Sequence, residues 1–151
     1  MTLRMPAEWE KQDAIWLAWP HNHEDWPGKF EPIPWVMADA IRYLTTQVRV
    51  RLIIKTPEMQ KKASNILDRA GVDPKKIDFI IALTNRIWLR DSGPTFVYDG
   101  KKRVLVDWKF NAWAKYKNWQ HDNKIPAVAA KVLKLKTVEP MHKGRHVVLE
   151  G

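Results

Sequence analysis

Apolar positions along this chain switch between strand spacing and helix spacing, which predicts a mixed α/β fold. An apolar run at 14–19 predicts a short strand. Apolar residues then recur at helical spacing from Met37 to Val48, and 48–55 alternates as a strand does. The later predicted elements are a helix over 56–70, a strand over 77–83, a hairpin of 95–98 and 103–108, a helix over 123–135, and short strands over 136–141 and 146–149.

Turn and cap residues separate these elements. Pro20 to Pro34 is a proline-punctuated loop. Thr56-Pro57-Glu58 begins a helix, because it supplies a capping hydroxyl, a proline at the first helical position and an acid in the first turn, and Gly71 ends it. Asp99-Gly100 is a hairpin turn. Short strands recur around single helices, so a structural repeat without a sequence repeat is possible.

The sequence ends inside or just after the apolar run 147–149. Because an unprotected strand edge invites aggregation, natural domains seldom end this way. We therefore expect residues 1–151 to be the N-terminal portion of a single domain, truncated at its C-terminal end, and to leave apolar faces open.

The segment from Thr84 to Thr95 is the strongest functional signal. It follows the apolar run 77–83 and closes in Ser92-Gly93-Pro94, which favours a turn. Trp88 and Asp91 are thereby gathered beyond the end of a core strand, where α/β folds place ligand sites. A carboxylate beside an indole suits a flat cation, because one supplies charge and the other a stacking face.

Composition narrows the classes of function. The chain has 151 residues, 45% of them hydrophobic, and no cysteine, which excludes disulfides, thiolate metal sites and a Cys nucleophile within it. Residues 1–10 lack the apolar core of a signal peptide, and no apolar run approaches the roughly 18 residues that span a bilayer. We expect a cytoplasmic protein with no membrane partner. The net charge of +9 is scattered, so we expect a solvated basic surface rather than a nucleic-acid interface.

A second acid, Glu150, also follows an apolar run, so Asp91 and Glu150 could face one pocket. In the alternative interpretation, Asp91 caps its own turn and Glu150 is a solvated terminal acid. For either acid taken alone, this alternative interpretation is favoured.

Five ordered motifs change that weighting, because together they resemble one family. They are Met5-Pro6-Ala7-Glu8-Trp9, Trp16-Leu17-Ala18-Trp19-Pro20, Trp88-Leu89-Arg90-Asp91-Ser92-Gly93-Pro94-Thr95, Asp107-Trp108-Lys109-Phe110-Asn111-Ala112-Trp113 and Leu149-Glu150-Gly151. The chain resembles the N-terminal part of the agmatine deiminase and bacterial-type peptidyl-arginine deiminase family. The resemblance runs from Met5 to the last residue and covers under half of a complete member.

The resemblance implies a pentein fold, in which five strand-and-helix modules surround a central active site, with about two modules present here. It also implies hydrolysis of a guanidino group to a ureido group with release of ammonia. The conversion of agmatine to N-carbamoylputrescine, a step of polyamine metabolism, is the type reaction. No cofactor or metal is implied, and the partner is a small guanidino substrate, agmatine or arginine-like.

The resemblance also assigns roles to residues. The family binds the guanidinium with two acids that match Asp91 and Glu150, and a tryptophan matching Trp88 lines the same pocket. The catalytic Cys and His of complete members lie beyond the matched region, so we expect this chain alone to be inactive. A chain that is short by nature, a degenerate paralogue, is the remaining possibility.

Three departures concern the rest of the substrate. Many members have Asn-Asp where this chain has Asn85-Arg86, agmatine deiminases have Gly where it has Lys109 and Ala114-Lys115, and Gln12 replaces a common His. Agmatine, a peptidyl-arginine and another guanidino compound therefore all remain open.

Two features could favour other functions. The loop His21 to Asp25 places alternate histidines as a divalent metal site would, but no further ligand follows at useful spacing, so we expect a solvated loop. Aromatic and lysine residues mix over 111–119, as on a stacking surface for single-stranded nucleic acid, although packing around a core explains them more simply. A non-catalytic basic binding module is thus the alternative to an enzyme.

Overall fold

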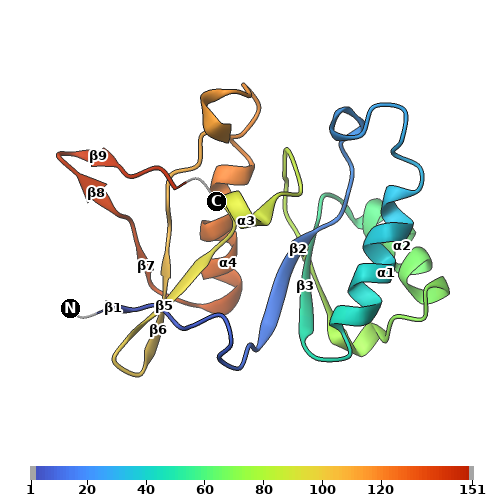
Figure 1. The fold of residues 1–151 in the computed structure, drawn as a ribbon, viewed down its shortest axis with the longest axis horizontal. Helices are drawn as coiled ribbons and strands as arrows, with labels where there is room; N and C mark the ends of the chain where they lie inside the picture. Colours follow the sequence, from blue (N-terminus) through green and yellow to red (C-terminus); the bar gives the residue numbers. More distant parts are fainter. Residues whose placement is uncertain (1–2, 150–151) are drawn as a thin grey trace. The chain divides into compact units, whose positions relative to one another are not determined.

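The computed structural model describes residues 3–149, and these form a mixed α/β structure, which confirms the predicted class. The chain divides into two compact units, one of residues 12–87 and one of residues 1–11 with 88–151. Figure 1 shows the elements of each unit. No helix within residues 3–149 has the length and apolar character needed to cross a membrane.

The unit of residues 12–87 is a parallel three-stranded sheet with two helices on one face. Its strands are β2 (Ala14–Ala18), β3 (Arg49–Ile54) and β4 (Ile77–Ile81), paired in that order. The helices α1 (Ile33–Leu44) and α2 (Pro57–Arg69) pack against each other along the sheet (Figure 1). Thr56 caps α2 by accepting a hydrogen bond from the Met59 amide at 3.2 Å, as its sequence predicts.

The core of this unit confirms the alternation predicted for β3. Val50, Leu52 and Ile54 are buried together with Ile41 of α1 and Leu67 of α2. Since successive strand residues point to opposite faces, Arg49 and Arg51 lie on the other face of the sheet, where Asp78 of β4 pairs with both. The helix-facing side of the sheet is therefore apolar, whereas the other face combines these charged residues with buried Ile53 and Ile80.

The other unit holds a four-stranded sheet in the order β1-β5-β6-β7. Its strands are β1 (Leu3–Arg4), β5 (Thr95–Asp99), β6 (Lys102–Val106) and β7 (Thr137–Val138). The predicted hairpin is confirmed, with β5 and β6 antiparallel. Helix α4 (Ile125–Leu133) follows a short 3-10 turn, η4 (Asp122–Lys124), and packs near β6.

The last described part of the chain differs from the two strands predicted there. Residues 137–138 form β7, and a separate small hairpin follows, made of β8 (Met141–His142) and β9 (Arg145–His146). Lys143 and Gly144 join these strands with φ values of 47° and 74°. Two consecutive positive φ angles match a type I′ turn, which lies in the gap between the two predicted strands and pairs β8 with β9 as a hairpin.

Candidate functional site

The segment 84–95 places Asp91 in a tight helical turn instead of directly at a strand end. Strand β4 ends at Ile81, and Trp88 begins the one-turn helix α3 (Leu89–Ser92). The Trp88 carbonyl accepts hydrogen bonds from the amides of Asp91 at 3.2 Å and Ser92 at 3.3 Å, and from Ser92 Oγ at 3.2 Å. These bonds fix the backbone of Asp91, whose side chain is half-buried.

Gly93 closes this turn at very short range. Its amide donates to the Leu89 carbonyl at 2.9 Å. A Cβ atom at position 93 would lie 2.2 Å from the Leu89 carbonyl oxygen, which is backbone and has little room to move. The φ of Gly93 is −79°, so close approach, and not backbone conformation, requires glycine here.

The Trp88 side chain belongs to an aromatic cluster of Trp88, Phe110, Trp113 and Tyr116. The rings of Trp88 and Trp113 lie 5.3 Å apart at 52°. Trp113 also meets the Phe110 ring at 5.4 Å and the Tyr116 ring at 6.1 Å, both edge-on. Such contacts are worth about 0.5–1.5 kcal/mol each beyond burial. Two of the aromatic residues considered above for nucleic-acid stacking, Trp113 and Tyr116, are therefore engaged in packing within this cluster.

The turn that carries Trp113 has an unusual backbone. Ala112, Trp113 and Ala114 have consecutive φ values of 53°, 55° and 54°. Left-handed conformation costs a residue with a Cβ roughly 1–2 kcal/mol, so such a run persists only where surrounding contacts impose it. The Asn111 carboxamide oxygen supplies one, by accepting from the Ala114 amide at 3.2 Å. This turn includes Ala114, one of the departures described above for the family resemblance.

Ala114→Gly is expected to raise the free energy of unfolding by about 0.5–1 kcal/mol. Glycine adopts positive φ without strain, and the exposed Ala114 methyl group loses little packing when removed, although the unfolded chain gains some freedom. Urea denaturation of the two proteins measures the difference. Lys115→Gly, one residue along at φ −97°, is the control and should lower stability. A loss of stability in Ala114→Gly would contradict the strain argument.

Glu150, the second predicted acid, lies outside the described residues. The chain just before it is placed by a short parallel bridge between Val148 and Lys109. The Lys109 amide donates to the Val147 carbonyl at 3.1 Å, and the Leu149 amide donates to the Lys109 carbonyl at 3.2 Å. Lys109 directly precedes Phe110 of the aromatic cluster. The approach to Glu150 therefore runs beside the segment that supports Trp88.

A cluster of mostly polar residues surrounds a cavity of about 170 Å³. Its lining residues are Asp107, Trp108, Lys109, Asn123, Glu139 and His146. His146 Nδ1 lies 3.7 Å from a Glu139 carboxylate oxygen. Burial raises the pKa of Asp107, the nearby Glu139 charge adds to the effect, and His146 opposes it.

Asp107→Asn is expected to raise stability at neutral pH and to flatten its dependence on pH. A carboxyl group with a raised pKa binds more protons in the folded state than in the unfolded one, so its contribution falls as pH rises above the ordinary value of 3.8. Urea midpoints between pH 3.5 and 7 measure this. The difference between variant and wild type should grow with pH, and a difference that shrinks would be contrary to this account.

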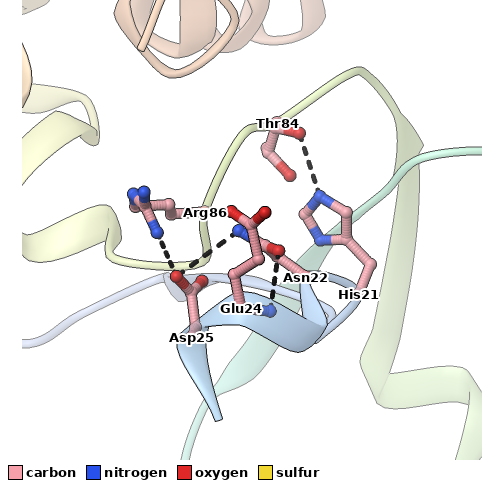
Figure 2. Close-up of polar contacts among 6 residues, drawn as sticks. All are labelled: His21, Asn22, Glu24, Asp25, Thr84 and Arg86. Carbon is pink, nitrogen blue, oxygen red and sulfur yellow. Dashed lines mark hydrogen bonds and ion pairs between the residues drawn. The ribbon is translucent and has the colours of Figure 1, made fainter. Parts of the chain in front are cut away.

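The loop at 20–26 and the segment 84–86 are joined by buried polar contacts (Figure 2). Arg86 forms an ion pair with Asp25, and the two side chains are only 6% and 1% exposed. His21 Nε2 lies 2.9 Å from the Thr84 carbonyl oxygen. Burial lowers the pKa of His21, and the Thr84 carbonyl opposes this shift. Removing one partner of a buried ion pair typically costs about 3–5 kcal/mol, because the other charge is left uncompensated.

These contacts change the interpretation of the 21–25 loop. It contains a short 3-10 turn, η1 (His23–Asp25), and His23 stacks on Phe30 with ring centroids 3.9 Å apart. Within residues 3–149, no three His, Cys, Asp or Glu side chains come together in a way that could hold a metal ion. The pairing of Asp25 with Arg86 was not predicted from the sequence, because it joins positions 61 residues apart.

Comparison with known proteins places the chain in a family. Residues 4–151 match the Porphyromonas-type peptidyl-arginine deiminase family. Agmatine deiminases of Pseudomonas aeruginosa strain LESB58 and Ectopseudomonas mendocina strain ymp are 30% and 29% identical to it, and the alignments cover 98% and 97% of this chain. Each alignment covers 39% of the relative, so the chain spans well under half the length of these curated proteins.

Solved structures agree in fold. A C. jejuni agmatine deiminase with substrate bound is 25% identical with a TM-score of 0.77, over 99% of this chain and 41% of that one. Agmatine deiminase of Enterococcus faecalis, at 24% identity and a TM-score of 0.76, matches 89% of this chain and 37% of that one. The chain therefore belongs to the Porphyromonas-type peptidyl-arginine deiminase family, and the family resemblance inferred from the five motifs is confirmed.

Proposed function

We propose that this chain contributes the guanidinium-binding part of a deiminase, which hydrolyses a guanidino group to a ureido group and releases ammonia. Family membership over residues 4–151 is the observation that carries the proposal. The fixed turn supports it, since it carries the half-buried Asp91 three residues after Trp88.

Asp91 and Glu150 are proposed to hold opposite edges of the substrate guanidinium. That group is planar, permanently charged and carries five N–H donors, so two carboxylates can accept from it in fork geometry. Each charge-assisted hydrogen bond contributes about 1.5–3 kcal/mol, against a desolvation cost of several kcal/mol for each buried ion. The pair is favourable only with the cation present, because two close carboxylates would otherwise repel.

Binding by Asp91 and Glu150 does not by itself break the C–N bond of the substrate. In the family resemblance, a Cys thiolate attacks the guanidinium carbon and a His transfers protons. This chain has no cysteine, and we infer that the nucleophile comes from residues outside it. In the pentein arrangement proposed here, this chain supplies about two of five modules around a central active site, and the other modules would supply the nucleophile.

The substrate is proposed to be agmatine or an arginine-like compound. The relatives named above are agmatine deiminases, whereas the matching family is named for peptidyl-arginine. A peptidyl-arginine substrate is therefore the second candidate. Isothermal titration with agmatine and with an arginine peptide separates the two by affinity.

An ammonia-release assay and a binding titration test the proposal together. We expect no turnover of agmatine or an arginine peptide by the 151-residue chain, and measurable agmatine binding that Asp91→Asn weakens. Robust turnover would refute the missing-nucleophile inference. Binding of a single-stranded oligonucleotide that falls steeply with salt, without any agmatine binding, would favour a basic binding module instead.

A further inference from the structure

The loop that follows β2 and the segment that follows β4 lie at the same edge of the parallel sheet. Both leave the carboxyl ends of their strands, and the sheet pairing continues for one residue beyond each. The Trp19 amide donates to the Ile53 carbonyl at 2.9 Å, and the Ala82 amide donates to the Ile54 carbonyl at 3.0 Å. The two segments therefore start from fixed points on β3 and run out from the same edge.

Side chains then join the two segments at two places (Figure 2). His21 meets the Thr84 carbonyl, and Asp25 pairs with Arg86. Asn22 prepares the second contact. Its side-chain oxygen accepts from the Glu24 amide at 3.1 Å to start the 3-10 turn, and its Nδ2 donates to Asp25 Oδ1 at 3.4 Å. Contacts within its own loop therefore orient the Asp25 carboxylate toward Arg86.

Arg86 lies just before the segment that carries Trp88 and Asp91, so its ion pair can fix the start of that segment. It lies two residues before Trp88 and five before Asp91, and a nearly inaccessible ion pair holds it. Replacing a buried pair with apolar residues often leaves stability unchanged or higher, so stability alone explains such a pair poorly. Registry, the fixing of one segment against another, is its best-attested use.

We propose that Asp25 and Arg86, with His21 on the Thr84 carbonyl, form a polar clamp that positions the backbone leading into Trp88 and Asp91 for guanidinium binding. The binding part of this inference rests on the proposed function. Asp25, Arg86 and His21 are positioning residues, because they act through the chain that carries Trp88 and Asp91 and not on the substrate.

Hydrogen exchange and agmatine titration of Asp25→Asn test the clamp in the 151-residue chain. The amides of Asp91, Ser92 and Gly93 report on the motif turn, because all three donate within it. The amide of Leu52 reports on the core of the unit of residues 12–87, which contains the clamp residues themselves. We expect protection of the turn amides to fall at least tenfold more than protection of Leu52, and agmatine to bind at least tenfold more weakly.

Two further variants separate positioning from stability. Arg49→Gln breaks an ion pair in the same unit, between Arg49 and Asp78, whose side chains are 41% and 42% exposed, and it should leave the turn amides and agmatine binding unchanged. Joint exchange, Asp25→Arg with Arg86→Asp, restores opposite charges and should recover part of the turn protection. His21→Ala leaves no unpaired charge and should lower turn protection by at least threefold, so it decides the matter if Asp25→Asn does not fold.

The outcomes distinguish the clamp from the proposed function. If wild type fails to bind agmatine while Asp25→Asn and His21→Ala still loosen the turn selectively, the clamp holds and the function fails. If wild type binds agmatine and the clamp variants match it in affinity and turn protection, the clamp is overturned. An equal loss of protection at Leu52 and in the turn also overturns it, because it reveals only a general loss of stability.

Discussion

Asp91→Asn is expected to lower kcat/KM for a guanidino substrate by about 100-fold in an enzyme that contains this chain together with its nucleophile. The amide keeps one acceptor oxygen but loses the charge that strengthens both hydrogen bonds to the guanidinium. A loss of about 3 kcal/mol, within the range for two weakened charge-assisted bonds, corresponds to this factor. Steady-state ammonia release measures it.

Asp99→Asn is the matched control for this prediction. Asp99 lies in the same unit, at the end of β5 and opposite Lys102, and asparagine has nearly the same shape as aspartate there. The control should retain wild-type kcat/KM. A value for Asp91→Asn within threefold of wild type would remove Asp91 from the binding site and favour a role as a cap of its own turn.

Gly93→Ala is expected to destabilise the chain by about 3 kcal/mol, the upper end of the usual cost of overpacking. The added methyl group would meet the Leu89 carbonyl oxygen at 2.2 Å, and the hydrogen bond that closes α3 involves that same oxygen. The turn must therefore open, which displaces Asp91. Urea denaturation measures the loss of stability, and hydrogen exchange at Ser92 reports whether the turn has opened.

Gly71→Ala is the comparison for Gly93→Ala. Gly71 has a φ of 76° with open space around it, so alanine there meets only backbone strain, about 1–2 kcal/mol. We therefore expect Gly93→Ala, which creates a steric clash, to lose more stability than Gly71→Ala, which creates only backbone strain. An equal or smaller loss at Gly93 would mean that α3 yields easily and does not hold Asp91 in place.

The elements that the sequence predicted well have strong local signals. β3 was found through its alternation, α2 through its cap and first-turn proline, and the β5–β6 hairpin through Asp99-Gly100. The start of α1 at Ile33 was missed because Pro34 was interpreted as loop, although proline is tolerated in the first helical turn. The β8–β9 turn was missed because Lys143 adopts a positive φ that lysine seldom does.

The sequence likewise identified some residues of the candidate site and not the contacts that support them. Trp88 and Asp91 could be identified, since a residue pattern and a family motif coincide on one short segment. The contacts that support these two residues could not be identified. Trp113 contacts Trp88 from a turn with a left-handed backbone, and none of the residue types in that turn predicts such a conformation. Asp25 pairs with Arg86 between two loops that are distant in the sequence. Such contacts depend on the folded path of the chain, which local pattern does not encode.

A crystal structure of the agmatine-bound enzyme that includes residues 1–151 tests the central claim most directly. We predict that carboxylate oxygens of Asp91 and Glu150 both lie about 2.7–2.9 Å from nitrogens of one guanidinium group, with the Trp88 ring beside it. Carboxylates on opposite sides of the molecule, or a guanidinium bound by neither, would contradict the account.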